Sequence, residues 1–233
     1  GRVQKGVRMR VVTIDPAGAS LYITQQRPRP QPAAGEVLLQ MRAASVNFRD
    51  ALLRAHPVSA YAGDLRGRVP LSDGVGIVSA VGDGVSDIKP GDRVMPSFFP
   101  DWLGQPLKAS LVQRSLGGSV DGVLADYAVF DARAVVPVPV HLSDVEAATL
   151  PCAALTAWSA LVDCGAAQAG QTILIQGTGG VSLFALQFAK QLGLRTIVSS
   201  SSDAKLARAR ELGADETLNY RKNPDWAASV RTL

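Results

Sequence analysis

The sequence has few of the residues on which disulfide frameworks and metal centres depend. It contains two cysteines, Cys152 and Cys164, and two histidines, His56 and His141. The cysteines form no CxxC pair, and neither histidine has a partner at a metal-ligand spacing. We therefore expect no disulfide framework, and the scarcity of cysteine favours a reducing compartment and a cytoplasmic location.

Long hydrophobic runs and blocks of like charge are also missing. The uncharged stretch at residues 147–162 contains Pro151 and is shorter than the roughly 18 apolar residues that a membrane span needs. The N-terminus lacks the apolar segment of a signal peptide. The 24 basic and 20 acidic residues give a net charge of +4 that is spread along the chain. We therefore expect neither a membrane nor a nucleic acid as a partner.

The composition, 47% hydrophobic and 19% charged, is that of a globular protein, and its first half is rich in β-strand patterns. Residues 36–42 alternate, with Val37, Leu39 and Met41 on one face, as in a half-buried strand. Residues 77–81 form a second extended run. We expect both segments to be strands.

Turn residues separate these runs. Asp83 and Gly84 favour a tight hairpin, and the sequence Lys-Pro-Gly-Asp at 89–92 suits a type II turn. Short strands with such punctuation predict a small barrel or sandwich. Residues 102–120 show no clean period, so we expect a long irregular excursion there.

The second half changes to an alternation of strands and helices. Ser143 and Glu146 form a capping-box pattern at the start of a helix. Residues 172–176 (TILIQ) are typical of a strand buried on both faces of a parallel sheet. The helix that follows carries an apolar stripe of Val181, Phe184, Ala185, Phe188, Ala189 and Leu192. The whole pattern predicts a βαβαβ unit over residues 172–176, 181–192, 196–199, 203–212 and 216–220.

A glycine-rich turn joins the first strand of this unit to its first helix: Gly177-Thr178-Gly179-Gly180-Val181-Ser182. Gly177 permits the tight turn, and Gly179 allows the backbone to approach a pyrophosphate. Backbone amides near Gly180 and Val181 would then face the anion from the helix N-terminus. Ser182 replaces the third glycine of the usual pattern. We expect this turn to bind a dinucleotide, and a purely structural turn is the alternative.

Taken in order, five stretches resemble the medium-chain dehydrogenase/reductase superfamily, and more closely its zinc-independent quinone oxidoreductase-like branch. The resemblance implies an α/β protein with a GroES-like β-barrel domain at residues 1–140. A Rossmann dinucleotide-binding domain would follow at residues 141–233. The matching stretches are residues 45–50, 73–78, 89–94, 150–158 and 176–182.

The same resemblance argues against a catalytic zinc. Zinc-dependent members hold the metal with Cys, His, Glu and Cys or His. This chain has Asn47, Ser72, Asp73 and Cys152 at those four positions. Because zinc needs about three ligands of nitrogen, sulfur or carboxylate type, we expect no metal. Cys152 is then interpreted as a small buried residue beside the cofactor.

The resemblance also implies the site. Asn47 and Asp50 would lie at the nicotinamide end of the cleft and Thr156 near the nicotinamide ring, which makes these three the catalytic candidates. An alternative makes Asp50 the cap of a helix that begins at Ala51. The expected cofactor-binding residues are Gly177, Thr178, Gly179, Gly180, Val181, Ser200, Ser201, Lys205 and Tyr220.

The residues after the second strand favour NADP(H). NAD-preferring sites place an acidic residue about 20 positions after the first glycines. Here that region is the serine run 199–202, and Asp203 is better placed to cap the next helix. Lys205 could pair with a 2′-phosphate, and Arg208 is a second candidate. In relatives of this kind a tyrosine after the third strand borders the adenosine phosphate, which Tyr220 matches.

We therefore predict a zinc-independent, NADP-dependent oxidoreductase that transfers hydride to a small-molecule quinone, enone or other carbonyl. One alternative is a dinucleotide-binding protein without turnover. Another is an alcohol dehydrogenase with a metal near Cys152 and Asp73. Because the chain offers three strands of the six usual in a Rossmann domain, we expect it to be part of a longer protein. The full-length form would be a homodimer.

Overall fold

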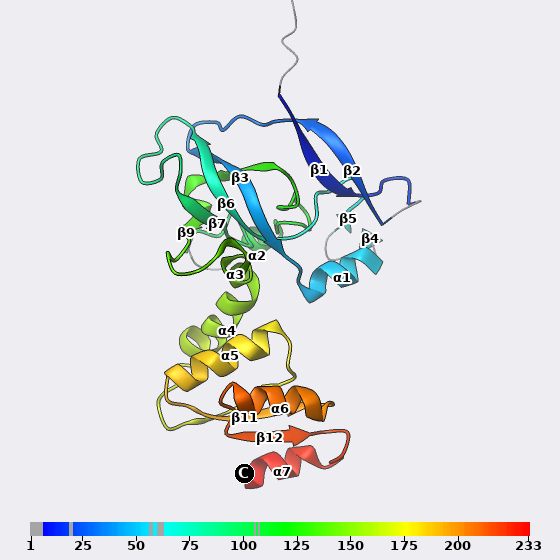
Figure 1. The fold of residues 1–233 in the computed structure, drawn as a ribbon, viewed down its shortest axis with the longest axis vertical. Helices are drawn as coiled ribbons and strands as arrows, with labels where there is room; N and C mark the ends of the chain where they lie inside the picture. The colour runs from blue at the N-terminus through cyan, green and yellow to red at the C-terminus, as the bar shows by residue number, and fades with distance from the viewer. Residues whose placement is uncertain (1–6, 19–20, 56–57, 60–62, 105, 107) are drawn as a thin grey trace, which may run out of the picture. The chain divides into compact units, whose positions relative to one another are not determined.

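The computed structural model describes residues 7–18, 21–55, 58–59, 63–104, 106 and 108–233. It divides into two compact units, Gly1–Cys152 and Ala153–Leu233. Figure 1 shows the strands of the first unit in blue to green and the helices and strands of the second in yellow to red.

The N-terminal unit is built on a five-stranded antiparallel sheet in the order β8-β3-β6-β7-β9. Its strands are β3 (Glu36–Ser45), β6 (Asp73–Val81), β7 (Arg93–Pro96), β8 (Tyr127–Asp131) and β9 (Val135–Pro137). The strands β1 (Arg8–Ile14) and β2 (Tyr22–Pro28) form an antiparallel hairpin. An isolated bridge connects Val11 of β1 to Ala125, two residues before β8. The pair β4 (Val58–Ser59) and β5 (Gly63–Asp64) completes the strands described.

Short helices connect these strands. They are α1 (Phe48–Ala55), α2 (Ala109–Val112), α3 (Asp144–Ala147) and the 3₁₀ turn Ala132–Ala134. The core of the sheet contains Val37, Leu39, Val78, Val94 and Phe130, all buried. Val135 of β9 belongs to the same cluster, so side chains from all five strands meet in it and the sheet curls around it.

The strand predicted at 36–42 is confirmed as part of β3, but its alternation is not strict. Leu38 is as buried as Val37 and Leu39, although it was expected on the opposite face. The pairing register with β6 shifts between Leu38 and Leu39, and such an irregularity breaks the period of two.

The turn predictions had mixed outcomes. Residues 82–92 join β6 to β7, so the tight hairpin expected at Asp83 and Gly84 is wrong. The turn at 89–92 is confirmed, with Gly91 at φ 96° and the Asp92 amide donating to the Lys89 carbonyl. The excursion at 102–120 contains only the single turn of α2 and one isolated bridge among its described residues.

The predicted capping box is confirmed at α3. The Ser143 hydroxyl accepts from the Glu146 amide, and the Glu146 carboxylate accepts from the Ser143 amide. Pro151 lies in a π-helical turn, Leu150–Ala154, that opens the next helical segment. The proline thus lies near the start of a helical segment, where a missing backbone N–H is tolerated.

The C-terminal unit has a parallel sheet in the order β10-β11-β12. The strands are β10 (Thr172–Gln176), β11 (Arg195–Ser200) and β12 (Glu216–Asn219), and α5 (Gly180–Gln191) and α6 (Asp203–Glu211) connect them. The helical segment α4 (Leu155–Trp158) with the π turn Ser159–Cys164 precedes the sheet, and α7 (Trp226–Thr232) follows it. The predicted βαβαβ unit is confirmed (Figure 1).

Two details of that unit differ from expectation. In the part of the chain that the structure describes, β10 pairs only with β11, so Leu174 is 36% exposed and only Ile175 is fully buried. The strand is therefore not buried on both faces. On α5, Ala189 is the fully buried member of the predicted stripe and Val181 is 40% exposed, whereas the other buried residue of the helix, Leu186, lies outside the stripe.

No helix among the described residues is both long and apolar enough to cross a membrane.

Candidate functional site

The glycine turn between β10 and α5 has the geometry of an anion-binding loop. Gly177 adopts φ +84°, which only glycine reaches without strain, and its amide donates to the Ser199 carbonyl at 2.8 Å. Gly179 is the N-cap of α5, with φ −80° and ψ −177°. The turn thus ends where the first backbone N–H groups of a twelve-residue helix begin, and these groups have no partner within the helix.

The space beside the turn differs from glycine to glycine. A Cβ on Gly179 would meet no heavy atom within 4 Å, so the backbone there is open to a ligand. A Cβ on Gly180 would lie 3.4 Å from the Ala153 Cβ, so that glycine faces protein. Ser182 donates to the Gln176 carbonyl at 3.1 Å and ties the helix to the strand. The serine that replaces the third glycine therefore packs α5 against β10.

These features fit the pyrophosphate of a dinucleotide. An open backbone face and a helix N-terminus with unsatisfied N–H groups favour an anion. No charged side chain belongs to the turn from Gly177 to Ser182. Binding there would thus rest on backbone groups.

The C-terminal ends of β11 and β12 lie side by side in the sheet, and β11 is the neighbour of β10, the strand that leads into the glycine turn. Ser200 is 4% exposed, and its carbonyl accepts from the Tyr220 amide at 3.2 Å. Its hydroxyl accepts from the Ser202 amide at 3.4 Å. Ser201 is half-buried between them. The structure therefore brings Ser200, Ser201 and Tyr220 together at one edge of the sheet.

The cap of α6 was assigned to the wrong residue. Ser202 is the N-cap, and its hydroxyl accepts from the Lys205 amide at 3.5 Å. Asp203 is the first residue of the helix instead. A serine at this position leaves the Asp203 carboxylate available for other partners.

Three further predicted residues lie on the surface of this unit. Lys205 is exposed in the first turn of α6, and Tyr220 is 42% exposed just after β12. Arg208 pairs with Glu211 at 2.6 Å, and both side chains are more than half exposed. Arg208 thus belongs to the solvated face of the helix, whereas Lys205 has no such partner on the helix among the ion pairs of the described residues.

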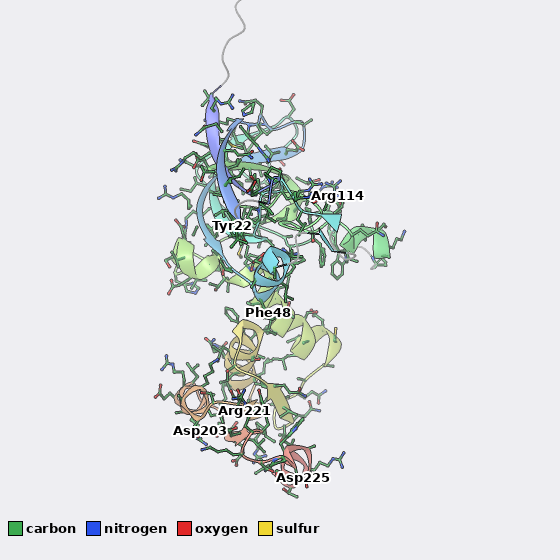
Figure 2. All side chains as sticks on the ribbon, turned by 90° about the vertical axis from the view of Figure 1, so that its right-hand side faces the viewer. Tyr22, Phe48, Arg114, Asp203, Arg221 and Asp225 are labelled. Atoms are coloured by element: carbon green, nitrogen blue, oxygen red, sulfur yellow. The ribbon has the colours of Figure 1, made fainter. Side chains whose placement is uncertain are left out.

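Sequence reasoning missed a cluster around Asp203. Asn219 Nδ2 donates to Asp203 Oδ1 at 2.6 Å, and Lys222 Nζ donates to Asp203 Oδ2. Hydrogen bonds from Lys222 and Asn219 lower the pKa of Asp203. The available signal was topological, because residues that follow adjacent parallel strands meet at one edge. Figure 2 shows Asp203 and Arg221, which lies beside Lys222, in this region.

In the N-terminal unit, Asn47 and Asp50 stand at the start of α1. The Asp50 carboxylate accepts from the Asn47 amide at 2.7 Å, and the Asp50 amide donates back to the Asn47 carbonyl. The helix begins at Phe48, so the alternative with Asp50 as the cap of a helix starting at Ala51 is wrong: Asp50 lies in the first turn, and its carboxylate accepts from the backbone N–H of Asn47, the residue before the helix. Burial raises the pKa of Asp50, and the nearby Asp73 raises it further against the effects of Asn47 and Arg49.

Asp73 is the centre of a buried polar cluster. Ser72 Oγ donates to its Oδ1 at 2.7 Å, the Cys152 amide donates to its Oδ2 at 3.0 Å, and neither Ser72 nor Asp73 is exposed. The side-chain amide of Asn47 lies near Asp73 and lowers its pKa. Its Nδ2 is buried and makes no well-formed hydrogen bond among the described residues. Burial raises the pKa of Asp73 more than these donors lower it.

This cluster does not fit a catalytic zinc. Asp73 already accepts from Ser72 and Cys152, and Asn47 and Ser72 are poor ligands for that metal. Among the described residues, no group of three or more His, Cys, Asp and Glu side chains could hold a metal ion. His141 is exposed, and His56 lies outside the described residues.

Thr156 belongs to the C-terminal unit. It is exposed on α4, three residues after Ala153, whose Cβ is the neighbour of Gly180. The structure therefore places Thr156 on the segment that packs beside the glycine turn.

Two family models match the chain. The one described as "Alcohol dehydrogenase GroES-like domain" matches residues 33–140, and the one described as "Zinc-binding dehydrogenase" matches residues 180–233. The predicted order, a GroES-like domain followed by the start of a dinucleotide-binding domain, is confirmed.

Individual proteins agree with the family models. A zinc-type alcohol dehydrogenase-like protein of Schizosaccharomyces pombe is 45% identical over 198 residues, 83% of this chain and 56% of that protein. A solved NAD-dependent alcohol dehydrogenase is 34% identical with a TM-score of 0.81, covering 97% of this chain and 67% of that one. The quinone oxidoreductase of Coxiella burnetii is 25% identical with a TM-score of 0.75, covering 95% and 65%. The chain therefore spans little more than half to two thirds of the length of these relatives.

Proposed function

Because the chain belongs to the medium-chain dehydrogenase/reductase superfamily, we propose that the protein transfers hydride from NADPH to a quinone, enone or other small carbonyl compound. The observation that carries the proposal is the open backbone face of Gly179 at the N-terminus of α5. A structural turn would need no empty space at that point. A pyrophosphate needs it.

The chain's own residues would hold the cofactor at two places. The backbone of Gly177, Thr178, Gly179, Gly180 and Val181 would bind the pyrophosphate. The adenosine end would lie against Ser200, Ser201, Lys205 and Tyr220, which come from the ends of β11 and β12 and from α6. The bound NADPH supplies the hydride, and the protein supplies position and electrostatics.

Asn47, Asp50 and Thr156 are proposed to form the nicotinamide and substrate end. Asp50 is 5% exposed and its carboxylate accepts from the backbone N–H of Asn47, so its contribution is to hold Asn47 in place at the start of α1. The side-chain amide of Asn47 is then the group that would donate to a carbonyl oxygen, and Thr156 presents a hydroxyl. The final proton would come from water.

We propose NADP(H) over NAD(H) on the residues near the adenosine ribose. The serine run 199–202 contributes hydroxyl groups, and the Lys205 side chain is exposed one turn into α6. A charge-assisted hydrogen bond contributes about 1.5–3 kcal/mol, so one from Lys205 to a 2′-phosphate would give at least about a tenfold preference.

The test is a fluorescence titration with NADPH and NADH. NADPH should bind at least about tenfold more tightly. Lys205→Ala should weaken NADPH binding and leave NADH binding nearly unchanged, whereas the control Arg208→Ala should change neither, because Arg208 pairs with Glu211. A wild-type preference for NADH, or an equal loss for both cofactors in Lys205→Ala, would overturn this proposal.

Two alternatives remain open to experiment. An alcohol dehydrogenase with zinc is favoured by the description of the model that matches residues 180–233 and by the name of the yeast relative. That match covers the nucleotide-binding region and not Asn47, Ser72 or Asp73. A cofactor-binding protein without turnover would bind NADPH and reduce no quinone, enone or aldehyde of a test panel. The panel is best measured on the full-length protein, which we propose to be a homodimer.

A further inference from the structure

We propose that Asn219 and Lys222 neutralise Asp203 and thereby let the adenosine site accept a 2′-phosphate. The three residues are called the Asp203 clamp below. The inference rests on the proposed function, because it concerns the same nucleotide site. It adds a specificity determinant that touches Asp203 and not the cofactor.

The geometry of the clamp joins the end of β12 to the start of α6. Asn219 is the last residue of β12, and its Oδ1 accepts from the Arg221 amide at 3.0 Å while its Nδ2 donates to Asp203 Oδ1 at 2.6 Å. Lys222 Nζ donates to Asp203 Oδ2. Asn219 and Lys222 therefore occupy both carboxylate oxygens of Asp203.

The position of Asp203 makes this occupation consequential. An acidic residue after the second strand selects NAD by accepting from the ribose 2′-hydroxyl, and its charge repels a 2′-phosphate. Asp203 is the first acidic residue after β11 and follows the N-cap Ser202. With Asn219 on one oxygen and Lys222 on the other, it is neither a free acceptor nor an uncompensated charge.

If the clamp acts through charge, the binding of a 2′-phosphate should depend on the net charge left at Asp203 and Lys222. Lys222→Met leaves the negative charge of Asp203 in place, Asp203→Asn leaves the positive charge of Lys222, and the double variant has neither. At several ångströms through water, one unit charge changes the binding of a phosphate by about threefold. The double variant should therefore regain the wild-type preference that Lys222→Met loses.

The experiment measures 2′,5′-ADP and 5′-AMP binding by calorimetry at low salt, with the ratio of the two dissociation constants as readout. These probes need only the adenosine site. The preference for 2′,5′-ADP should fall by about threefold in Lys222→Met, rise by a similar factor in Asp203→Asn, and return to the wild-type value in the double variant. High salt should shrink all three effects.

Arg208→Met is the matched control, because it also removes one positive charge and leaves a carboxylate unpaired, but that carboxylate, Glu211, stands at the opposite end of α6 from Asp203. The ratio should not change in this variant. The clamp's side chains are 72% and 59% exposed at Lys222 and Asp203, so the fold should survive, which thermal unfolding checks.

Different failures have different meanings. If wild-type protein prefers 5′-AMP, the proposed NADP(H) function fails. If it prefers 2′,5′-ADP but Lys222→Met leaves the ratio unchanged, the clamp proposal fails alone. A double variant as weak as Lys222→Met also overturns the clamp, because Lys222 would then contact the phosphate directly.

Discussion

Replacing Gly179 with alanine separates cofactor binding from folding. The backbone of Gly179, at φ −80° and ψ −177°, is open to any residue, and its Cβ would meet no atom within 4 Å. Alanine lowers the entropy of the unfolded chain but is a poorer N-cap than glycine. The two effects oppose each other, so the free energy of unfolding should change by less than about 1 kcal/mol.

Binding should respond differently. The methyl group of Gly179→Ala would occupy the face from which a pyrophosphate approaches the helix N-terminus. A displacement that costs about 1.4 kcal/mol already weakens binding tenfold, so we expect at least a tenfold loss of NADPH affinity.

Gly177→Ala is the matched comparison in the same turn. Its φ of +84° is strained for alanine by about 1–2 kcal/mol, so this variant should lose stability. The assay pairs urea unfolding, followed by tryptophan fluorescence, with a titration of NADPH on each folded variant. The loss of stability should therefore be larger in Gly177→Ala than in Gly179→Ala, whose main effect should be on NADPH affinity.

Wild-type affinity in Gly179→Ala would refute the reasoning, because no ligand would then approach the turn closely. A loss of more than about 2 kcal/mol of stability in Gly179→Ala would also refute it, since the space beside the residue would not be free.

Three further outcomes are expected. Asp215→Ala should lower the free energy of unfolding by about 2 kcal/mol at pH 7, because Asp215 accepts from the buried Thr196 amide at 2.7 Å. The Lys190 ammonium and Thr196 lower the pKa of Asp215 to about 2, so urea titrations should show this difference shrinking as pH falls from 3.8 toward about 2. Asp50→Ala should cost about 1 kcal/mol and speed hydrogen exchange in α1, while Asp50→Asn should cost less at neutral pH, because burial raises the pKa of Asp50. Elemental analysis after dialysis should find well below one zinc per chain, and stoichiometric zinc would contradict the ligand argument.

The features that could be predicted are those that short-range chemistry determines. Ser143 and Glu146 satisfy each other's amides across one helical turn, so the capping box is visible in four residues. Pro90 and Gly91 set the backbone of their turn in the same way. The alternation of strands and helices after residue 172 follows from hydrophobic period, and the glycine turn follows from its place in that alternation.

The features that could not be predicted depend on which strands become neighbours. The exposure of Leu174 follows from the pairing of β10 with β11 alone among the described strands, which its apolar sequence does not reveal. The contact of Asp203 with Asn219 and Lys222 requires β11 and β12 to be adjacent and parallel. Likewise, Asp73 meets the Cys152 amide across 79 residues of sequence, and no local pattern encodes that bond.

The hydrogen bond from the Cys152 amide to Asp73 determines where a fragment of the N-terminal unit should end. The predicted domain boundary at residue 140 would remove α3, whose Ala147 and Ala148 pack with Val75 and Val138, and would take away the Cys152 amide. A fragment ending at residue 140 would thus expose the apolar side of Val75 and leave Asp73 with one donor fewer in a dry environment. A fragment ending at residue 152 keeps both. Anyone who dissects this protein to study the barrel alone should extend it through the cysteine.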